Sequence, residues 1–253
     1  MDSELAERML RDYDAKDPGT VFAEGLRLTI PEAFDLQTAV TGLREARGET
    51  VAGYKIGCTC EGNQRANGIN HPVWGRLWQG EQFASDASLK KSDYVNLGIE
   101  GEFAVTLSRD IDPDRVDEDT VLLSIESIFT VIELHNMLMR GEAPRGHELI
   151  ANNCIHSGVV RSEPNPLPKD TVETDLAILF DGEVVDSWDV LRWPDEILQA
   201  IPWLAQQLAS RDVMLKAGDT LLTGAFGPPI PLGAKATVEV VSSAFGSVIA
   251  TFE

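Results

Sequence analysis

At Val51 the hydrophobic pattern of this chain changes from helical to extended, and this change limits the architectures open to it. Before Val51, apolar residues recur at helical spacing from Ala33 to Ala46, after a Thr29-Ile30-Pro31-Glu32 segment that is typical of a helix start. After Val51, short apolar runs alternate with Gly, Pro, Asn and Asp, as strands and turns do. The runs that predict strands are Val51–Ile56, Glu102–Leu107, Val121–Leu134, Val172–Phe180, Thr220–Thr223, Thr237–Val241 and Ser247–Phe252.

Two further patterns refine this prediction. The segment Trp193–Leu208 has a helical pattern, and Pro202 within it predicts a kink or two shorter helices. Asp181-Gly182-Glu183 lies between two apolar runs and predicts a hairpin turn. We therefore predict an N-terminal helical appendage over residues 1–50 and a β-rich domain over residues 51–253.

The charge of the chain excludes several kinds of partner. Among its 253 residues, 41 are acidic and 21 are basic, which gives a formal net charge of −20. Such a field repels nucleic acid and anionic membranes. No run approaches the roughly 18 apolar residues of a membrane helix, and the N-terminus lacks the basic and apolar regions of a secretion signal. We expect a cytoplasmic protein whose partner is a small molecule or another copy of itself.

The cysteines and histidines give no metal or disulfide pattern. The three cysteines are an odd set, too few for a disulfide framework, so we interpret them as buried free thiols. The four histidines lack the spacing of a zinc site and are interpreted as structural or surface residues. These residues are Cys58, Cys60, Cys154, His71, His135, His147 and His156.

An acidic strand carries the clearest chemical signal. In Gly98–Leu107, Glu100 and Glu102 are separated by Gly101, and side chains two apart on a strand share a face roughly 6–7 Å apart. Glu133, alone in the apolar run Ile128–Leu134, offers a third oxygen. Three clustered carboxylates repel one another unless a cation joins them, so the pattern predicts a hard divalent cation. The alternative is that these are solvated surface groups of an acidic protein.

Two shorter motifs carry possible roles in binding or proton transfer. Lys55 lies in the apolar run Gly53–Gly57, where desolvation predicts a lowered pKa and a use as acid, base or anion holder. The alternative is a lysine that protects an edge strand. Thr223-Gly224 ends another apolar run, and its hydroxyl and N–H groups suit a carboxylate, although an ordinary turn has the same pattern.

Taken together, these residues resemble the 2-keto-4-pentenoate hydratase group of the fumarylacetoacetate hydrolase superfamily. The resemblance rests on their order and spacing from about Glu32 to the C-terminus. The segments that carry it are Gly53–Thr59 around Lys55, Glu100-Gly101-Glu102, Val131–Leu134 around Glu133, Ala151–Asn153, Ala217–Asp219, Thr223–Pro228 and Phe245–Val248.

The resemblance implies an α+β fold, a mixed β-sandwich or β-roll of the fumarylacetoacetate hydrolase C-terminal-domain type with the helical appendage. It also implies a homo-oligomer, with Mg²⁺ or Mn²⁺ held by Glu100, Glu102 and Glu133. The implied reaction adds water to a 2-hydroxy-2,4-dienoate through a metal-bound enolate. Lys55 would meet the substrate carboxylate or move a proton, and Thr223 with Gly224 would anchor the substrate.

The chain also departs from this group. An Asp-Asn-Ala-Ser segment of the group is Asn152-Asn153-Cys154-Ile155 here, Asn70 and Val73 replace acidic positions, and His135–Leu138 replaces an Asp-Ser-Arg-like stretch. The acid and base around the metal have therefore changed. We predict that His71, His135 or His156 carries the proton and that Asn152 contacts the substrate.

Three other functions stay open. A decarboxylase of a vinylogous 2-oxo diacid would need a cation for the second carboxylate, and a carbon–carbon hydrolase of an acylpyruvate would need a base such as a Glu61–His71 pair. A catalytically silent partner subunit is the third. The cationic residues considered for the decarboxylase are Arg65, Arg76, Arg140 and Arg145.

Overall fold

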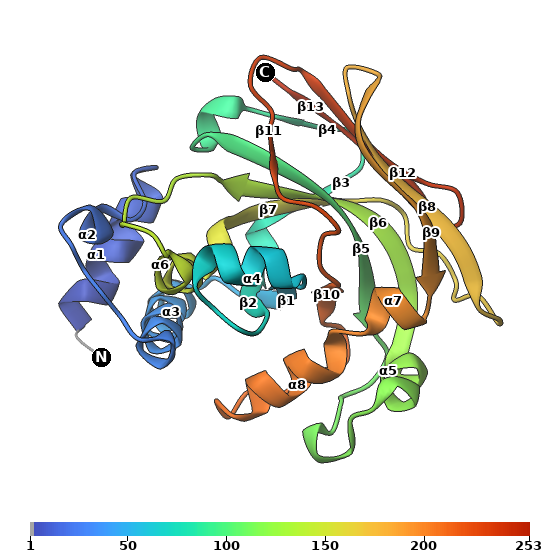
Figure 1. Ribbon diagram of the computed structural model, residues 1–253, viewed down its shortest axis with the longest axis horizontal. Helices are drawn as coiled ribbons and strands as arrows, with labels where there is room; N and C mark the ends of the chain where they lie inside the picture. The colour runs from blue at the N-terminus through green and yellow to red at the C-terminus, as the bar shows by residue number, and fades with distance from the viewer. Residues whose placement is uncertain (1–2) are drawn as a thin grey trace.

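The computed structural model describes residues 3–253, and its N-terminal helices gather at one end of the molecule (Figure 1). The predicted helix start at Thr29 is confirmed. The Thr29 side chain accepts a hydrogen bond from the Glu32 N–H while Glu32 accepts one from the Thr29 N–H, a capping box. These helices are α1 Ser3–Asp14, α2 Thr20–Ala23 and α3 Ile30–Ala46. Met1 and Asp2 of the N-terminal pattern lie outside the described residues.

Helix α3 is tied to the β-rich body by a buried amide. Gln37 Nε2 donates to the Trp74 carbonyl at 3.1 Å and to the Ile150 carbonyl at 2.9 Å. A buried amide that satisfies two carbonyls fixes the orientation of the helix. The division at residue 50 stays a prediction.

The larger sheet mixes parallel and antiparallel pairs. Its order is β2-β1-β10-β5-β6-β7-β3, with β11 paired to β5, and the β1–β10 and β3–β7 pairs are parallel. Its strands are β1 Val51–Gly57, β2 Val73–Trp78, β3 Gln82–Ala84, β5 Leu97–Leu107, β6 Ile125–Asn136, β7 His156–Arg161, β10 Thr220–Leu222 and β11 Ile230–Pro231.

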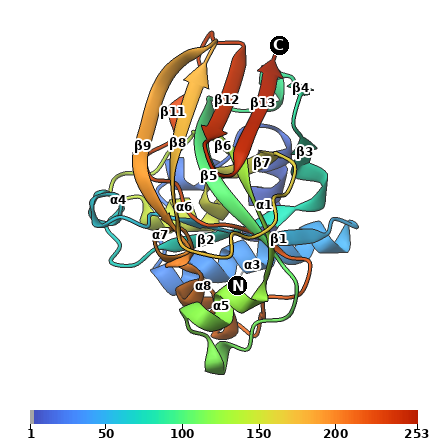
Figure 2. The same cartoon turned by 90° about the vertical axis from the view of Figure 1, so that its right-hand side faces the viewer.

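A second sheet packs over β5 and β6, as Figure 2 shows. Gly101 permits this approach, because a Cβ there would lie 2.9 Å from Cγ1 of Ile178 and 3.1 Å from Cγ1 of Val240. The order is β4-β13-β12-β8-β9. Its strands are β4 Ala87–Leu89, β8 Val172–Phe180, β9 Glu183–Trp193, β12 Thr237–Ser242 and β13 Gly246–Phe252. Two packed sheets with N-terminal helices confirm the predicted α+β class.

Two sequence predictions need comment. The strand predicted over Val121–Leu134 is wrong at its start, because Asp117 caps a helix there by accepting from the Thr120 N–H. The segment forms two shorter helices, as predicted, with Pro202 in the first turn of the second one, although Trp193 belongs to β9. The remaining helices are α4 Glu61–Asn67, α5 Glu118–Ser124, α6 Gly146–Ala151, α7 Asp195–Leu198 and α8 Ile201–Ala209, with 3-10 turns η1 Gln79–Glu81, η2 Lys91–Asp93, η3 Pro113–Arg115 and η4 Asn153–Ile155.

The predicted hairpin joins β8 and β9. Phe180 pairs with Glu183, and Asp181 and Gly182 both have positive φ, 51° and 82°. Such angles suit a two-residue turn that follows the twist of the sheet. None of the helices described between Ser3 and Glu253 is long and apolar enough to cross a membrane.

Candidate metal centre and active site

The three predicted carboxylates converge on one face of the β5–β6 ladder. Glu100 lies directly opposite Glu133 in the antiparallel register, and Glu102 is two residues further along β5. The Glu102 and Glu133 residues are 1% and 0% exposed. Because side chains alternate along a strand, Gly101 faces the second sheet while its two neighbours face away from it.

His135 joins this acidic group from the same strand as Glu133. Its Nε2 lies 2.8 Å from Oε2 of Glu100 and 3.5 Å from Oε2 of Glu133. One ligand atom from each of these three residues lies within 4.8 Å of the other two. Sequence reasoning had named His135 only as a proton carrier. The strand period could have identified His135 as a candidate ligand, because residues two apart on a strand, such as Glu133 and His135, share a face.

Glu102 is held by a backbone group rather than by a side-chain cation. The Gly224 N–H donates to its Oε2 at 2.9 Å. Burial raises the pKa of the Glu102 carboxyl well above its ordinary value, and the charges of Glu133 and Glu100 raise it further. Glu102 therefore ionises with more difficulty than Glu133 in the metal-free protein.

Lys55 supplies the positive charge that the cluster needs. It lies on β1, which has β2 and β10 on its two sides, so it does not protect an edge strand. Its Nζ is 2.8 Å from Oε1 of Glu133, and both side chains are buried.

The predicted lowering of the Lys55 pKa is wrong. Burial does lower it, but the carboxylates around the ammonium, with Glu133 first among them, raise the pKa above its ordinary value. The pKa of Glu133 is affected in the opposite direction. Burial raises this pKa, but the positive charge of Lys55 outweighs burial, so the pKa of Glu133 lies well below its ordinary value. The two groups therefore form an ion pair in the metal-free protein.

The residues present fit a divalent cation. Oε2 of Glu133 is fully buried and finds no hydrogen-bond partner anywhere in the described chain. An orphaned carboxylate oxygen in a protein interior is costly, and a cation would satisfy it. Carboxylate oxygens suit Mg²⁺ and Mn²⁺. The structure thus presents a possible acidic metal site.

A cavity of about 410 Å³ opens beside this cluster. Lys55, Glu100 and His135 line it together with apolar side chains from the segment after β6 and from Pro228-Pro229. Its volume lies within the range of small-ligand sites. Cys58 and Cys154 also line it, and both are free thiols, whereas the predicted buried thiol Cys60 is exposed.

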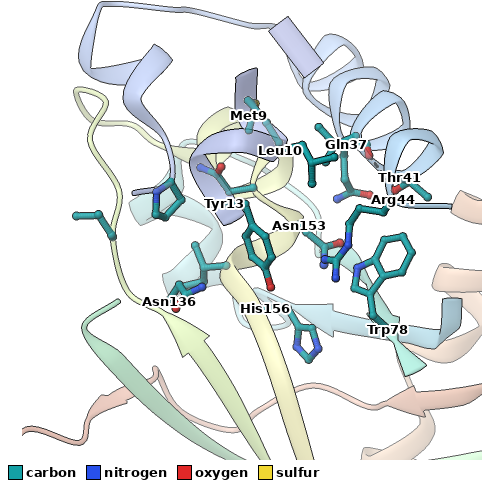
Figure 3. Close-up of a pocket in the computed structure, with 16 residues that line it drawn as sticks. Met9, Leu10, Tyr13, Gln37, Thr41, Arg44, Trp78, Asn136, Asn153 and His156 are labelled. Carbon is teal, nitrogen blue, oxygen red and sulfur yellow. Dashed lines mark hydrogen bonds between the residues drawn. The ribbon is translucent and has the colours of Figure 1, made fainter. Parts of the chain in front are cut away.

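His156 and Asn152 line a different pocket, and Figure 3 shows His156 there. This pocket lies between α1, α3 and the start of β7, with Tyr13 and Asn153 among its lining residues. His156 still reaches the cluster, since its Nδ1 is 2.8 Å from Oε1 of Glu133. Asn152 does not line the cavity with Glu100. The catalytic and substrate-binding roles of these two residues stay predictions.

The other predicted site residues lie apart from the cavity. Nδ1 of His71 is 2.6 Å from the Pro72 carbonyl, and its ring stacks on Trp203 with centroids 6.2 Å apart. Thr223 and Gly224 line another pocket, and the Thr223 hydroxyl donates to the Phe103 carbonyl at 3.1 Å. The structure brings Gly224 to the cluster only through its N–H bond with Glu102. A substrate contact by His71, Thr223 or Gly224 stays a prediction.

Comparison with known proteins finds similar sequences that are named hydratases. The 2-keto-4-pentenoate hydratase of Burkholderia vietnamiensis (strain G4 / LMG 22486) is 28% identical over 99% of this chain and 98% of its own. The TodF product hydratase of Pseudomonas putida F1 is 29% identical over 87% of this chain and 83% of its own. No model of a known protein family matches the chain.

Among solved structures, the 4-oxalocrotonate decarboxylase of Pseudomonas putida G7, complexed with magnesium and adipate, has the same fold. It superimposes with a TM-score of 0.88 at 22% identity and covers 99% of this chain and 97% of its own. A fumarylacetoacetate hydrolase family protein of Yersinia pestis CO92 has a TM-score of 0.57 at 19% identity, covering 79% of this chain and 92% of its own. The chain is therefore similar in sequence to 2-keto-4-pentenoate hydratases over most of its length, and it shares the fold of a 4-oxalocrotonate decarboxylase and of a fumarylacetoacetate hydrolase family protein.

Proposed function

We propose that this protein is a hydro-lyase that adds water to a 2-hydroxy-2,4-dienoate. The observation that carries the proposal is the joint placement of Lys55, Glu100 and His135 at one cavity, with the buried Glu133 paired to Lys55, in a chain that aligns with named hydratases over most of its length. A small acid suits the cavity, whose lining combines charged and polar groups with apolar side chains.

The acidic cluster would hold Mg²⁺ or Mn²⁺. Glu100, Glu102 and Glu133 are the proposed ligands, and His135 is placed to join them. When bound, the cation would supply positive charge next to the 2-oxo group of the substrate, where negative charge develops as the dienol changes to the ketone. The metal-complexed decarboxylase structure supports the choice of a hard divalent ion.

Lys55 would orient the substrate. Its ammonium stays protonated beside Glu133, so it can hold the substrate carboxylate or donate a proton, but it cannot start as a base. The apolar side chains of the cavity would shield the hydrocarbon part of a bound substrate from water, which would strengthen these charge interactions.

The first test is the ultraviolet absorbance of 2-hydroxypenta-2,4-dienoate in the presence of purified protein and Mg²⁺. Decay of the dienol absorbance that stops with a chelator, and that yields the hydrated 2-oxo acid, supports the proposal. The Glu173→Gln protein, changed at an exposed carboxylate of β8, is the matched control and should react like wild type. Absence of decay with Mg²⁺ and with Mn²⁺ would contradict the proposal for this substrate.

A decarboxylase of a vinylogous 2-oxo diacid is the second candidate. It is favoured by the similarity to the 4-oxalocrotonate decarboxylase fold over 99% of the chain. Release of CO₂ from 4-oxalocrotonate, without uptake of water, would identify this activity.

The oligomeric state is also proposed from the resemblance to the hydratase group. We propose a homo-oligomer, which light scattering coupled to size exclusion tests directly.

A further inference from the structure

One arginine in the cavity has no acidic partner. Of the four arginines considered for a second carboxylate, Arg65 pairs with Glu61 and Arg140 pairs with Asp17. Arg76 is buried and donates to the Gln37 side chain instead. Arg145 lines the cavity that Lys55 and Glu100 also line, and it forms no ion pair with any residue between Ser3 and Glu253.

The Arg145 side chain is held in place by its own loop. Its Nε donates to the Gly141 carbonyl at 2.6 Å. That loop is in turn anchored by the fully buried Glu148, which accepts hydrogen bonds from the N–H of Arg140 at 2.6 Å and of Gly141 at 2.8 Å. Since Nε is engaged, the two terminal amino groups of Arg145 are left for another acceptor. A fixed guanidinium loses little freedom when it binds a carboxylate.

Polar side chains of α4 accompany Arg145. The backbone after Arg145 packs against the end of α4, because a Cβ on Gly146 would lie 2.6 Å from the Asn67 carbonyl. Asn63 and Asn67 line the same cavity. Amide groups add donors for an anion that the guanidinium binds.

Apolar side chains line the same cavity. Met137, Met139 and Leu149 line the cavity and offer no charge. The cavity therefore combines an acidic cluster suited to a cation, an apolar surface and an arginine without a carboxylate. In a chain with 41 acidic and 21 basic residues, an unpaired arginine inside a cavity indicates an anionic ligand.

We propose that Arg145 binds a second carboxylate at the far end of the substrate, so that the natural substrate is a dicarboxylic 2-oxo or 2-hydroxydienoic acid. This inference rests on the proposed function, because it assumes that the other end of the substrate binds at the acidic cluster.

The experiment compares two unreactive 2-oxo acids that differ in one carboxylate. Binding of 2-oxoadipate and of 2-oxohexanoate is measured by calorimetry with wild-type protein in saturating Mg²⁺. We expect 2-oxoadipate to bind at least roughly tenfold more tightly, since a charge-assisted hydrogen bond to an arginine has about that effect. The Arg145→Met protein should lose this preference and bind 2-oxohexanoate as wild type does, while Arg145→Lys should keep part of it.

Matched controls separate the possible outcomes. Arg192→Met, at an exposed arginine of β9, should leave both affinities unchanged. Equal binding of the two acids by wild type would overturn the role of Arg145 and leave the proposed function standing. If neither acid binds in Mg²⁺ or in Mn²⁺, the proposed function itself fails, and this inference fails with it. The wild-type comparison decides the question even if the Arg145 variants do not fold.

Discussion

Nζ of Lys55 lies 2.8 Å from Oε1 of Glu133, with the two side chains only 3% and 0% exposed. The lysine comes from β1 and the glutamate from β6, strands that are separated in the sheet by β10 and β5. This buried ion pair neutralises one carboxylate of the acidic cluster. The charge of the cluster in the metal-free protein therefore depends on Lys55.

Lys55→Met should destabilise the metal-free protein by about 3–5 kcal/mol, because it leaves a buried carboxylate without a partner. Mg²⁺ should restore part of this loss, since a cation can replace the missing positive charge. Hydratase activity should fall even in saturating Mg²⁺. Urea unfolding with Mg²⁺ and with a chelator measures the free energy of unfolding of the two forms. Lys169→Met, at an exposed loop lysine, is the control. Unchanged stability in the chelator would contradict the assigned pair.

Glu102→Ala should abolish both Mn²⁺ binding and activity, because it removes one of three proposed carboxylate ligands. Calorimetric titration with Mn²⁺ measures the affinity. His135→Ala is compared with it, since the closest group of ligand atoms contains His135 rather than Glu102. Retained binding in Glu102→Ala with lost binding in His135→Ala would show that the cation lies between Glu100, Glu133 and His135.

The stability of the metal-free protein should depend on the ionisation of Glu102. Its folded pKa is raised above the ordinary 4.5, so the folded state holds a proton that the unfolded state releases. This contribution to stability is full below pH 4.5 and is lost as the pH rises through the folded pKa. Urea unfolding across this pH range, in a chelator, should show a smaller decline for Glu102→Gln than for wild type. An identical decline in the two proteins would assign it to other groups.

Gly101→Ala should destabilise the protein by about 1–3 kcal/mol, because the added methyl would enter the contact between the two sheets. The new Cβ would lie 2.9 Å from Ile178 and 3.1 Å from Val240. Gly42→Ala is the matched control, because it lies in α3 with no atom within 4 Å of the added Cβ. It should stabilise the helix by about 0.5–1 kcal/mol. Thermal unfolding of both variants should therefore show a lowered melting temperature for Gly101→Ala and a raised one for Gly42→Ala.

Local chemistry in the sequence was sufficient to predict most elements. The Thr29 and Glu32 capping residues marked the start of α3, and Asp181-Gly182 marked the β8–β9 turn. The strand prediction was wrong at Val121–Ser124, since apolar residues there suit either a strand or a short helix. The cap at Asp117 decided between them.

Periodicity was also sufficient to place Glu100 and Glu102 on one face of a strand. It did not predict that Glu133 lies directly opposite Glu100, because the register of two strands depends on the whole ladder. The same period of two places His135 on the face of Glu133, so the strand pattern could also have predicted His135 as a candidate ligand.

The sequence by itself determined the α+β class, the acidic strand and the similarity to named hydratases. Only the tertiary structure decided the charge state of Lys55, because its pKa depends on carboxylates from β5 and β6 that are distant in the chain. Likewise, the fold decided that Arg145 lines the cavity while Arg65 and Arg140 pair with surface carboxylates. Charge interactions act through space and fall off with distance, so residues far apart in the sequence set the chemistry of a site only once the chain has folded.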